Sequence, residues 1–244
     1  MAEEAMGAAP AVRGVASDRG MGWWTDSWAL FMKNAGMWIV LGLLFCVILL
    51  VLGMVPFLGS IATSLLLPAF MGGWMITARK VENGGTVEVG DLFAGFKDKV
   101  NALMVLGGLL VAASLVIIIV MSILGFGAVM GIGMGGAHQS VGGVLAAAAA
   151  GLFALLVGLA LSVPVAMALW FAPALVVFND VAPVEAAKAS FAACLRNIVP
   201  SLIYGVVFLV ACIVAAIPFG LGFIVLIPVT MLSIYISYRD VFGA

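Results

Sequence analysis

Long apolar runs separated by short polar segments dominate the chain. A helix needs about 20 apolar residues to cross the roughly 30 Å hydrocarbon core of a bilayer. Runs of that kind occupy residues 35–54, 60–77, 102–126, 144–178, 199–217 and 221–238. The pattern therefore predicts an all-α integral membrane protein with six transmembrane helices.

Prolines mark the later helix of each successive pair of runs. Pro68, Pro164 and Pro228 lie inside apolar segments, and proline removes one helical hydrogen bond, so we expect helix kinks at all three positions. The run 144–178 would be about 52 Å long as a helix. Because that length exceeds a bilayer, we expect this run to tilt, to bend at Pro164 or Pro173, or to project into water.

The charged residues fall on one side of a six-span arrangement. All 10 Lys and Arg residues and all 11 Asp and Glu residues lie in segments that six spans place together. The opposite loops, around Pro56, over 125–143 and around Pro218, hold none. Basic residues concentrate on the cytoplasmic side of membrane proteins, so we expect both termini to be cytoplasmic.

The chain also repeats itself three times. Residues 27–42 and 190–205 share a serine, an aromatic, a basic residue followed by asparagine, and a glycine at matching places, and 92–107 is a looser third copy. Each of the three prolines begins a Pro-x-x-Met sequence. We expect three parallel two-span repeats, at about 23–80, 91–180 and 183–243, within a single membrane domain 23–244. Residues 1–22 are expected to form a flexible cytoplasmic tail.

An amphipathic segment opens each repeat. We interpret these segments as interfacial helices that lie in the headgroup region, with Asp91 as the N-cap of the second and Pro183 in the first turn of the third. Their aromatic side chains are the candidate interfacial anchors: Trp24, Trp28, Phe31, Phe93, Phe96 and Phe191. Anchoring of the following span is the favoured role; a collar that senses lipid or a partner is the alternative.

Composition excludes several classes of protein. Apolar residues make up 66% of the chain and charged residues only 9%, whereas soluble domains carry about 25% charged residues. The net charge of −1 gives no basic surface for nucleic acid. The spans contain no Asp, Glu, Lys, Arg or His, which argues against a proton-coupled pump.

Three sequence features could suggest a nucleotide-binding, metal or thiol site, but each lacks the neighbouring residues that such a site requires. Gly131, Gly133 and Gly136 spell GxGxxG, but no strand or acidic residue accompanies them. His138 is the single histidine and has no nearby ligand for a zinc site. The three cysteines, Cys46, Cys194 and Cys212, are expected to be small buried hydrophobes. We therefore expect no catalytic residues, no cofactor and no metal.

Three sequence features carry a resemblance to a known group of proteins. The Trp-rich opening, LPAFMGGWM at 67–75 and DLFAGFKDK at 91–99 resemble an uncharacterised family of proteobacterial six-helix inner-membrane proteins. In plan the chain is similar to the membrane domain of some glycerophosphodiester phosphodiesterases. The resemblance implies this fold in the bacterial inner membrane and implies no activity, because the phosphodiesterase catalytic domain is absent.

These features together favour a non-enzymatic inner-membrane protein, acting as an accessory, scaffold or lipid-interacting subunit. Its expected partners are the lipid bilayer and a membrane-protein partner or a second copy of the chain. The alternative is a small transporter or channel for an apolar or uncharged substrate, with a pathway between the repeats. A membrane enzyme acting on lipid is disfavoured, because no constellation of ionisable groups is present.

Overall fold

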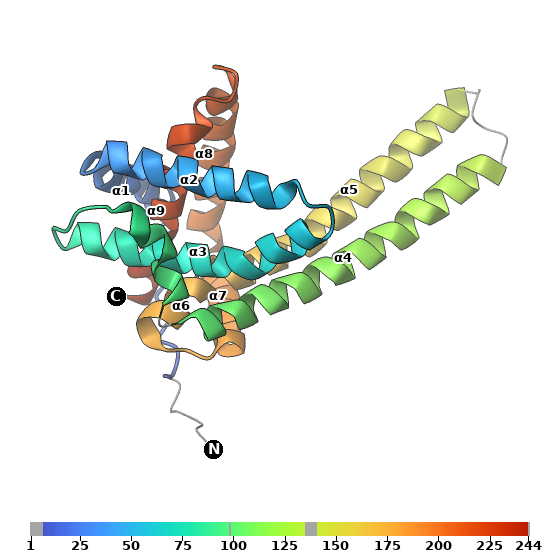
Figure 1. Ribbon diagram of the computed structural model, residues 1–244. Coiled ribbons are helices and arrows are strands. Elements are labelled where there is room, and N and C mark those ends of the chain that lie inside the picture. The colour runs from blue at the N-terminus through green and yellow to red at the C-terminus, as the bar shows by residue number, and fades with distance from the viewer. Residues whose placement is uncertain (1–6, 98, 135–140, 244) are drawn as a thin grey trace. The chain divides into compact units, whose positions relative to one another are not determined.

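The computed structural model describes residues 7–97, 99–134 and 141–243 (Figure 1). The regular secondary structure of these residues is helical, apart from one isolated parallel bridge between Gly7 and Val181. The elements are α1 (Arg19–Met32), α2 (Ala35–Gly53), α3 (Leu58–Glu82), the 3₁₀ helix η1 (Val89–Phe96), α4 (Val100–Met134), α5 (Val141–Trp170), α6 (Ala172–Asn179), α7 (Pro183–Arg196), α8 (Ile198–Ala216) and α9 (Phe223–Phe242). The all-α prediction is confirmed.

Six helical stretches in the described residues are long and apolar enough to cross a membrane. They are Ala35–Gly53, Leu58–Glu82, Val100–Leu124, Ala148–Asn179, Ile198–Ala216 and Phe223–Phe242. Each contains most or all of one predicted apolar run, so the predicted number of candidate spans is confirmed.

The proline positions differ in their effect. Pro68, Pro164 and Pro228 lie inside α3, α5 and α9 without ending them, and their kinks stay predictions. The interruption in the long fourth run occurs at Phe171, between α5 and α6, with Pro173 in the first turn of α6. Proline is tolerated there because the first helical N–H groups need no partner within the helix.

The sequence predicts a loop or an extension of the third span over 125–143, and the described residues of this segment are helical. Helix α4 continues to Met134 and α5 begins at Val141. Glycine disfavours helix in water, but in a bilayer a helix satisfies its own backbone groups where no water can. Gly131 and Gly133 thus lie on α4, whereas Gly136 and His138 lie outside the described residues.

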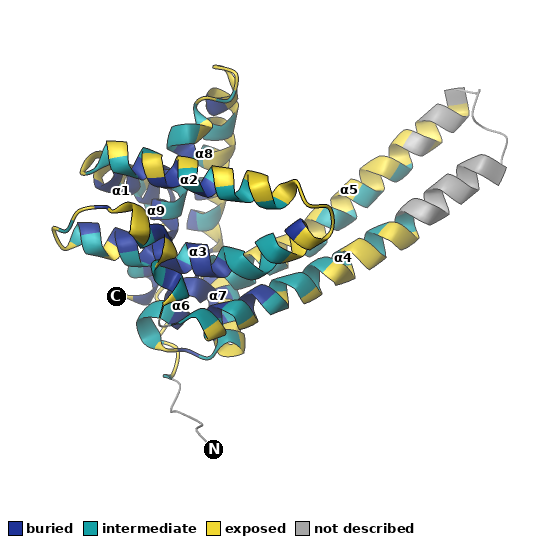
Figure 2. Ribbon diagram, in the orientation of Figure 1, coloured by how far each residue is buried: buried dark blue, intermediate teal, exposed yellow. Residues whose placement is uncertain are grey.

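The chain contains two compact units, and the single membrane domain 23–244 stays a prediction. The first comprises Met1–Gly108 and Ala168–Ala244, and the second Leu109–Met167. In the second unit, consecutive turns of α4 and α5 expose large apolar side chains (Figure 2), among them Ile119, Ile123, Leu152 and Leu156. Such surfaces suit a lipid environment.

The core of the first unit lies between α2, α3 and α9. Trp38 of α2 and Trp74 of α3 are fully buried and stack, with ring centroids 5.6 Å apart and planes at 12°. Leu41, Leu103 and Leu232 are fully buried as well. Close helix approach depends on glycine: a Cβ on Gly95 of η1 would lie 2.1 Å from the carbonyl oxygen of Ala69 on α3.

The expected flexible tail requires correction. Helix α1 already begins at Arg19, and the preceding residues are held by hydrogen bonds. The N–H of Gly7 donates to the carbonyl of Asp180 (3.0 Å), and that of Arg13 donates to the carbonyl of Val241 (2.8 Å). Backbone groups of this segment thus find partners on folded elements that are distant in sequence, which composition alone does not reveal.

Candidate functional site

Charged and hydrogen-bonding groups gather where α1, η1, α6 and α7 meet the C-terminal ends of α3 and α9. We call this region the charged end of the first unit. Three packing contacts organise it: α1 packs against α9, η1 against α3, and α7 against α6. The polar residues that follow belong to these elements, to the residues that flank them or to the segment before α1.

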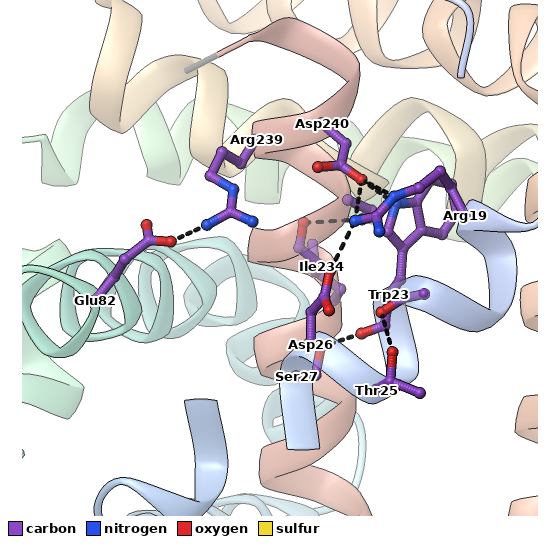
Figure 3. A network of polar contacts seen from close by, with 11 residues as sticks. Arg19, Trp23, Thr25, Asp26, Ser27, Glu82, Ile234, Arg239 and Asp240 are labelled. Atoms are coloured by element: carbon purple, nitrogen blue, oxygen red, sulfur yellow. Dashed lines mark hydrogen bonds and ion pairs between the residues drawn. The ribbon is translucent and has the colours of Figure 1, made fainter. Parts of the chain in front are cut away.

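An arginine clamp joins the N-terminal helix to the C-terminal helix (Figure 3). Arg19 donates from Nε to Asp240 (2.6 Å) and from a terminal nitrogen to Asp26 (2.8 Å). The indole N–H of Trp23 also donates to Asp240 (3.0 Å). The hydrogen bond with Asp26 and the interactions with Asp240 raise the pKa of Arg19, although burial opposes the shift. The clamp therefore joins α1 to α9.

A second cluster surrounds Glu82 at the end of α3. Its carboxylate accepts hydrogen bonds from Arg239 and from the phenol of Tyr235 (2.5 Å). Figure 3 shows the Arg239 guanidinium directed at Glu82. Nearby, the guanidinium of Arg79 lies 4.9 Å from the ring centroid of Phe178, and Tyr238 donates to the side chain of Asn179.

The start of η1 differs from the prediction. Glu88, not Asp91, is the N-cap, and Asp91 is the third helical residue of a capping box in which its carboxylate accepts from the N–H of Glu88 (2.8 Å). Both carboxylates also pair with Lys80 of α3. The predicted N-cap was wrong because the helix begins three residues earlier than its hydrophobic pattern suggests.

Acidic and basic residues differ in how many of them form ion pairs within the protein. Among the described residues every Asp and Glu except Asp18 takes part in an ion pair. Five described basic residues have no such partner, and all five are exposed: Arg13, Lys33, Arg79, Lys97 and Arg196. The described acids are thus largely neutralised within the protein, and the unpaired charge is mainly positive.

The predicted aromatic anchors do not share one environment. Trp24 and Phe31 are buried, and Trp24 stacks on Tyr204 of α8 with centroids 5.0 Å apart. Trp28 and Phe93 are exposed, whereas Phe96 and Phe191 are half-buried. Helical spacing suggested a single lipid face on the first segment, but its neighbours α8 and α9 cover part of it. Anchoring by the exposed residues stays a prediction.

Asn197 was not anticipated as an important side chain. It is buried at the junction of α7 and α8, accepts from the N–H of Val15 (2.8 Å), and donates to the carbonyls of Arg13 (2.9 Å) and Ala193 (3.0 Å). The paired asparagines of the repeat were the available signal. Asn34, its counterpart in the predicted repeat, makes no side-chain hydrogen bond to a described residue, in contrast to Asn197.

The described residues contain no group of three or more His, Cys, Asp and Glu arranged to hold a metal ion. Cys194 is buried in α7, and burial raises the pKa of its thiol to about 12. A thiol with that pKa is protonated at neutral pH and is a poor nucleophile. The chemistry that this end offers is therefore charge recognition and hydrogen bonding.

The fold and the charged end together define a multi-pass helical membrane protein. Over 250 residues the chain is 26% identical to a protein of Burkholderia thailandensis described as a probable inner membrane protein, covering 94% of this chain and 93% of that relative. No protein-family profile and no solved structure matches the chain. We therefore assign it to the inner membrane; the likeness to the membrane domain of phosphodiesterases stays a prediction.

Proposed function

We propose that this protein is a non-enzymatic, lipid-interacting subunit of the inner membrane that presents a cationic surface to anionic phospholipid on the cytoplasmic side. The observation that carries the proposal is the difference between paired acids and unpaired, exposed bases at the helix ends. Basic side chains near a membrane surface attract anionic lipid by about 1 kcal/mol each.

The threefold repeat is part of the proposal, and equivalent helix starts support it. Helices α2, α4 and α8 begin at the same repeat position, at Ala35, Val100 and Ile198. The first helical hydrogen bond of each span is 3.0 Å and joins equivalent residues, with donors Trp38, Leu103 and Ser201 and acceptors Asn34, Lys99 and Asn197. Three copies of one leading segment would place their basic residues at one membrane face.

Lipid preference provides the direct test. We expect the purified full-length protein to retain phosphatidylglycerol in preference to phosphatidylcholine when native mass spectra are recorded from a gentle detergent, because only the former has a net negative headgroup. The preference should weaken at high salt, which screens exposed charges. Equal retention of the two lipids at low salt would reject the proposal. Identification of a co-purifying protein in the same preparation would test the scaffold role.

The orientation makes a separate prediction. Alkaline phosphatase fused after Gly85, between α3 and η1, should be inactive, because the positive-inside bias retains this basic segment in the cytoplasm. Fusion after Met134, at the end of α4, should be active. The two fusion sites are separated by a single span. Each fusion therefore serves as the control for the other when both are expressed at the same level. The opposite pattern of activities would invert the proposed orientation.

A further inference from the structure

Two arginines occupy equivalent places in the repeat. Arg79 lies eleven residues after Pro68, and Arg239 lies eleven residues after Pro228. In the same alignment the position fourteen residues after each proline holds a glutamate once and a phenylalanine twice. These residues are Glu82, Phe178 and Phe242. At this position the first repeat therefore has a carboxylate, and the second and third repeats have a phenyl ring.

Four contacts join one repeat to the next in the same order. Arg239 of the third repeat pairs with Glu82 of the first, and Arg79 of the first lies over Phe178 of the second, 4.9 Å from its centroid. Two further residues at matching positions, Tyr235 and Phe171, contact Glu82 and Phe242 respectively, the latter with ring centroids 5.6 Å apart. In each case a residue contacts position fourteen of the next repeat.

One of these contacts lacks its counter-ion. Arg239 meets the carboxylate of Glu82, fourteen residues after Pro68. Arg79 meets the ring of Phe178, fourteen residues after Pro164, in place of a carboxylate. No carboxylate of the described residues forms an ion pair with Arg79, which is exposed. Glu82 already accepts from two donors, and Asn179 accepts from Tyr238. Because a guanidinium keeps its charge at any physiological pH, this exposed arginine can pair with an anion from outside the protein.

We infer that Arg79 binds the phosphate of an anionic phospholipid headgroup, an inference that rests on the proposed function and deepens it. Arg79 lies in the last turn of α3, a candidate span, where lipid phosphates would lie. The Phe178 ring holds the guanidinium by a cation–π contact, which reduces the entropy lost when phosphate binds. The planar fork of N–H donors matches phosphate oxygens. The neighbouring Lys80 is already engaged by Glu88 and Asp91.

The test compares full-length variants in native mass spectra titrated with phosphatidylglycerol and phosphatidylcholine. Arg79→Gln should bind phosphatidylglycerol about five-fold more weakly, with phosphatidylcholine unchanged. Phe178→Glu should cause a similar loss, because it restores the missing counter-ion, whereas the uncharged Phe178→Gln should retain most of the affinity. Arg79→Lys keeps the charge and should fall between Arg79→Gln and the parent protein. Gel filtration establishes that each variant remains folded and monodisperse.

Lys188→Gln is the matched control, because it removes the same charge from an exposed base that is already paired with Glu185. If it weakens binding as much as Arg79→Gln does, or if Arg79→Gln binds like the parent protein, the inference is overturned. A parent protein that prefers phosphatidylglycerol while Arg79→Gln is unaffected overturns only this site, whereas a parent without preference overturns the proposed function. Competition by inorganic phosphate at millimolar concentration would assign the phosphate site to a soluble ligand; its absence supports the lipid headgroup.

Discussion

Replacing Gly107 by leucine is expected to destabilise the first unit by about 3 kcal/mol or more. A Cβ at this position of α4 would lie 2.3 Å from the carbonyl oxygen and 2.6 Å from the Cα of Leu65 on α3. Both are backbone atoms, so no side-chain rotation can relieve the clash, and the two helices would have to separate. Thermal unfolding in detergent, followed by circular dichroism, should show a lowered midpoint.

Gly108→Leu is the control for this substitution. Gly108 is the next residue on the same helix, and a Cβ there would have no atom within 4 Å. We expect it to leave the midpoint unchanged or slightly raised, since leucine favours helix over glycine by up to about 1 kcal/mol. Equal midpoints for the two variants would show that α3 and α4 do not approach at Leu65.

Asn197→Ala is expected to cost about 2–4 kcal/mol and to release the segment that precedes α1. The amide side chain is 2% exposed and joins that segment to α7 through three hydrogen bonds. Alanine would leave the N–H of Val15 and the carbonyl of Arg13 without these partners. Trypsin should then cleave after Arg13 faster than in the parent protein, which gel electrophoresis can follow at a temperature where both remain folded.

Asn34→Ala tests whether this effect is specific. Asn34 occupies the equivalent position before α2, but its side chain makes no hydrogen bond within the described part of the chain, whereas that of Asn197 makes three. We expect its substitution to change neither the stability nor the rate of cleavage after Arg13 appreciably. If Asn197→Ala is cleaved as slowly as Asn34→Ala, the N-terminal segment is held by its other contacts, and the importance assigned to Asn197 is wrong.

The spans could be predicted from sequence because length and apolarity are local properties. The starts of the first and fifth spans were predicted to within one residue, at Ala35 and Ile198. The packing of the short helices could not be predicted in the same way. Helical spacing placed Trp24 on an apolar face, but only the fold reveals that Tyr204, 180 residues away, covers it.

The charged end was anticipated only as a one-sided distribution of charge. Its pairings depend on residues far apart in the chain, such as Arg19 with Asp240 and Glu82 with Arg239. Composition counts charges but cannot say which of them are satisfied internally. The repeat supplies part of that information, because Arg79 and Arg239 can be compared position by position. Identifying the missing carboxylate partner of Arg79 therefore requires both the alignment of the proposed repeats and the contacts in the structure.

The contact between α1 and α9 has a consequence for biosynthesis. Ribosomes make α1 before α9, yet Arg19 and Trp23 meet Asp240, which is 221 and 217 residues further along the chain. Until α9 is inserted, the buried faces of Trp23, Leu30 and Phe31 have no complete set of neighbours. A chain that stalls or is truncated before α9 would therefore expose a hydrophobic, tryptophan-rich helix, a surface by which proteases of the membrane can distinguish unfinished molecules from complete ones.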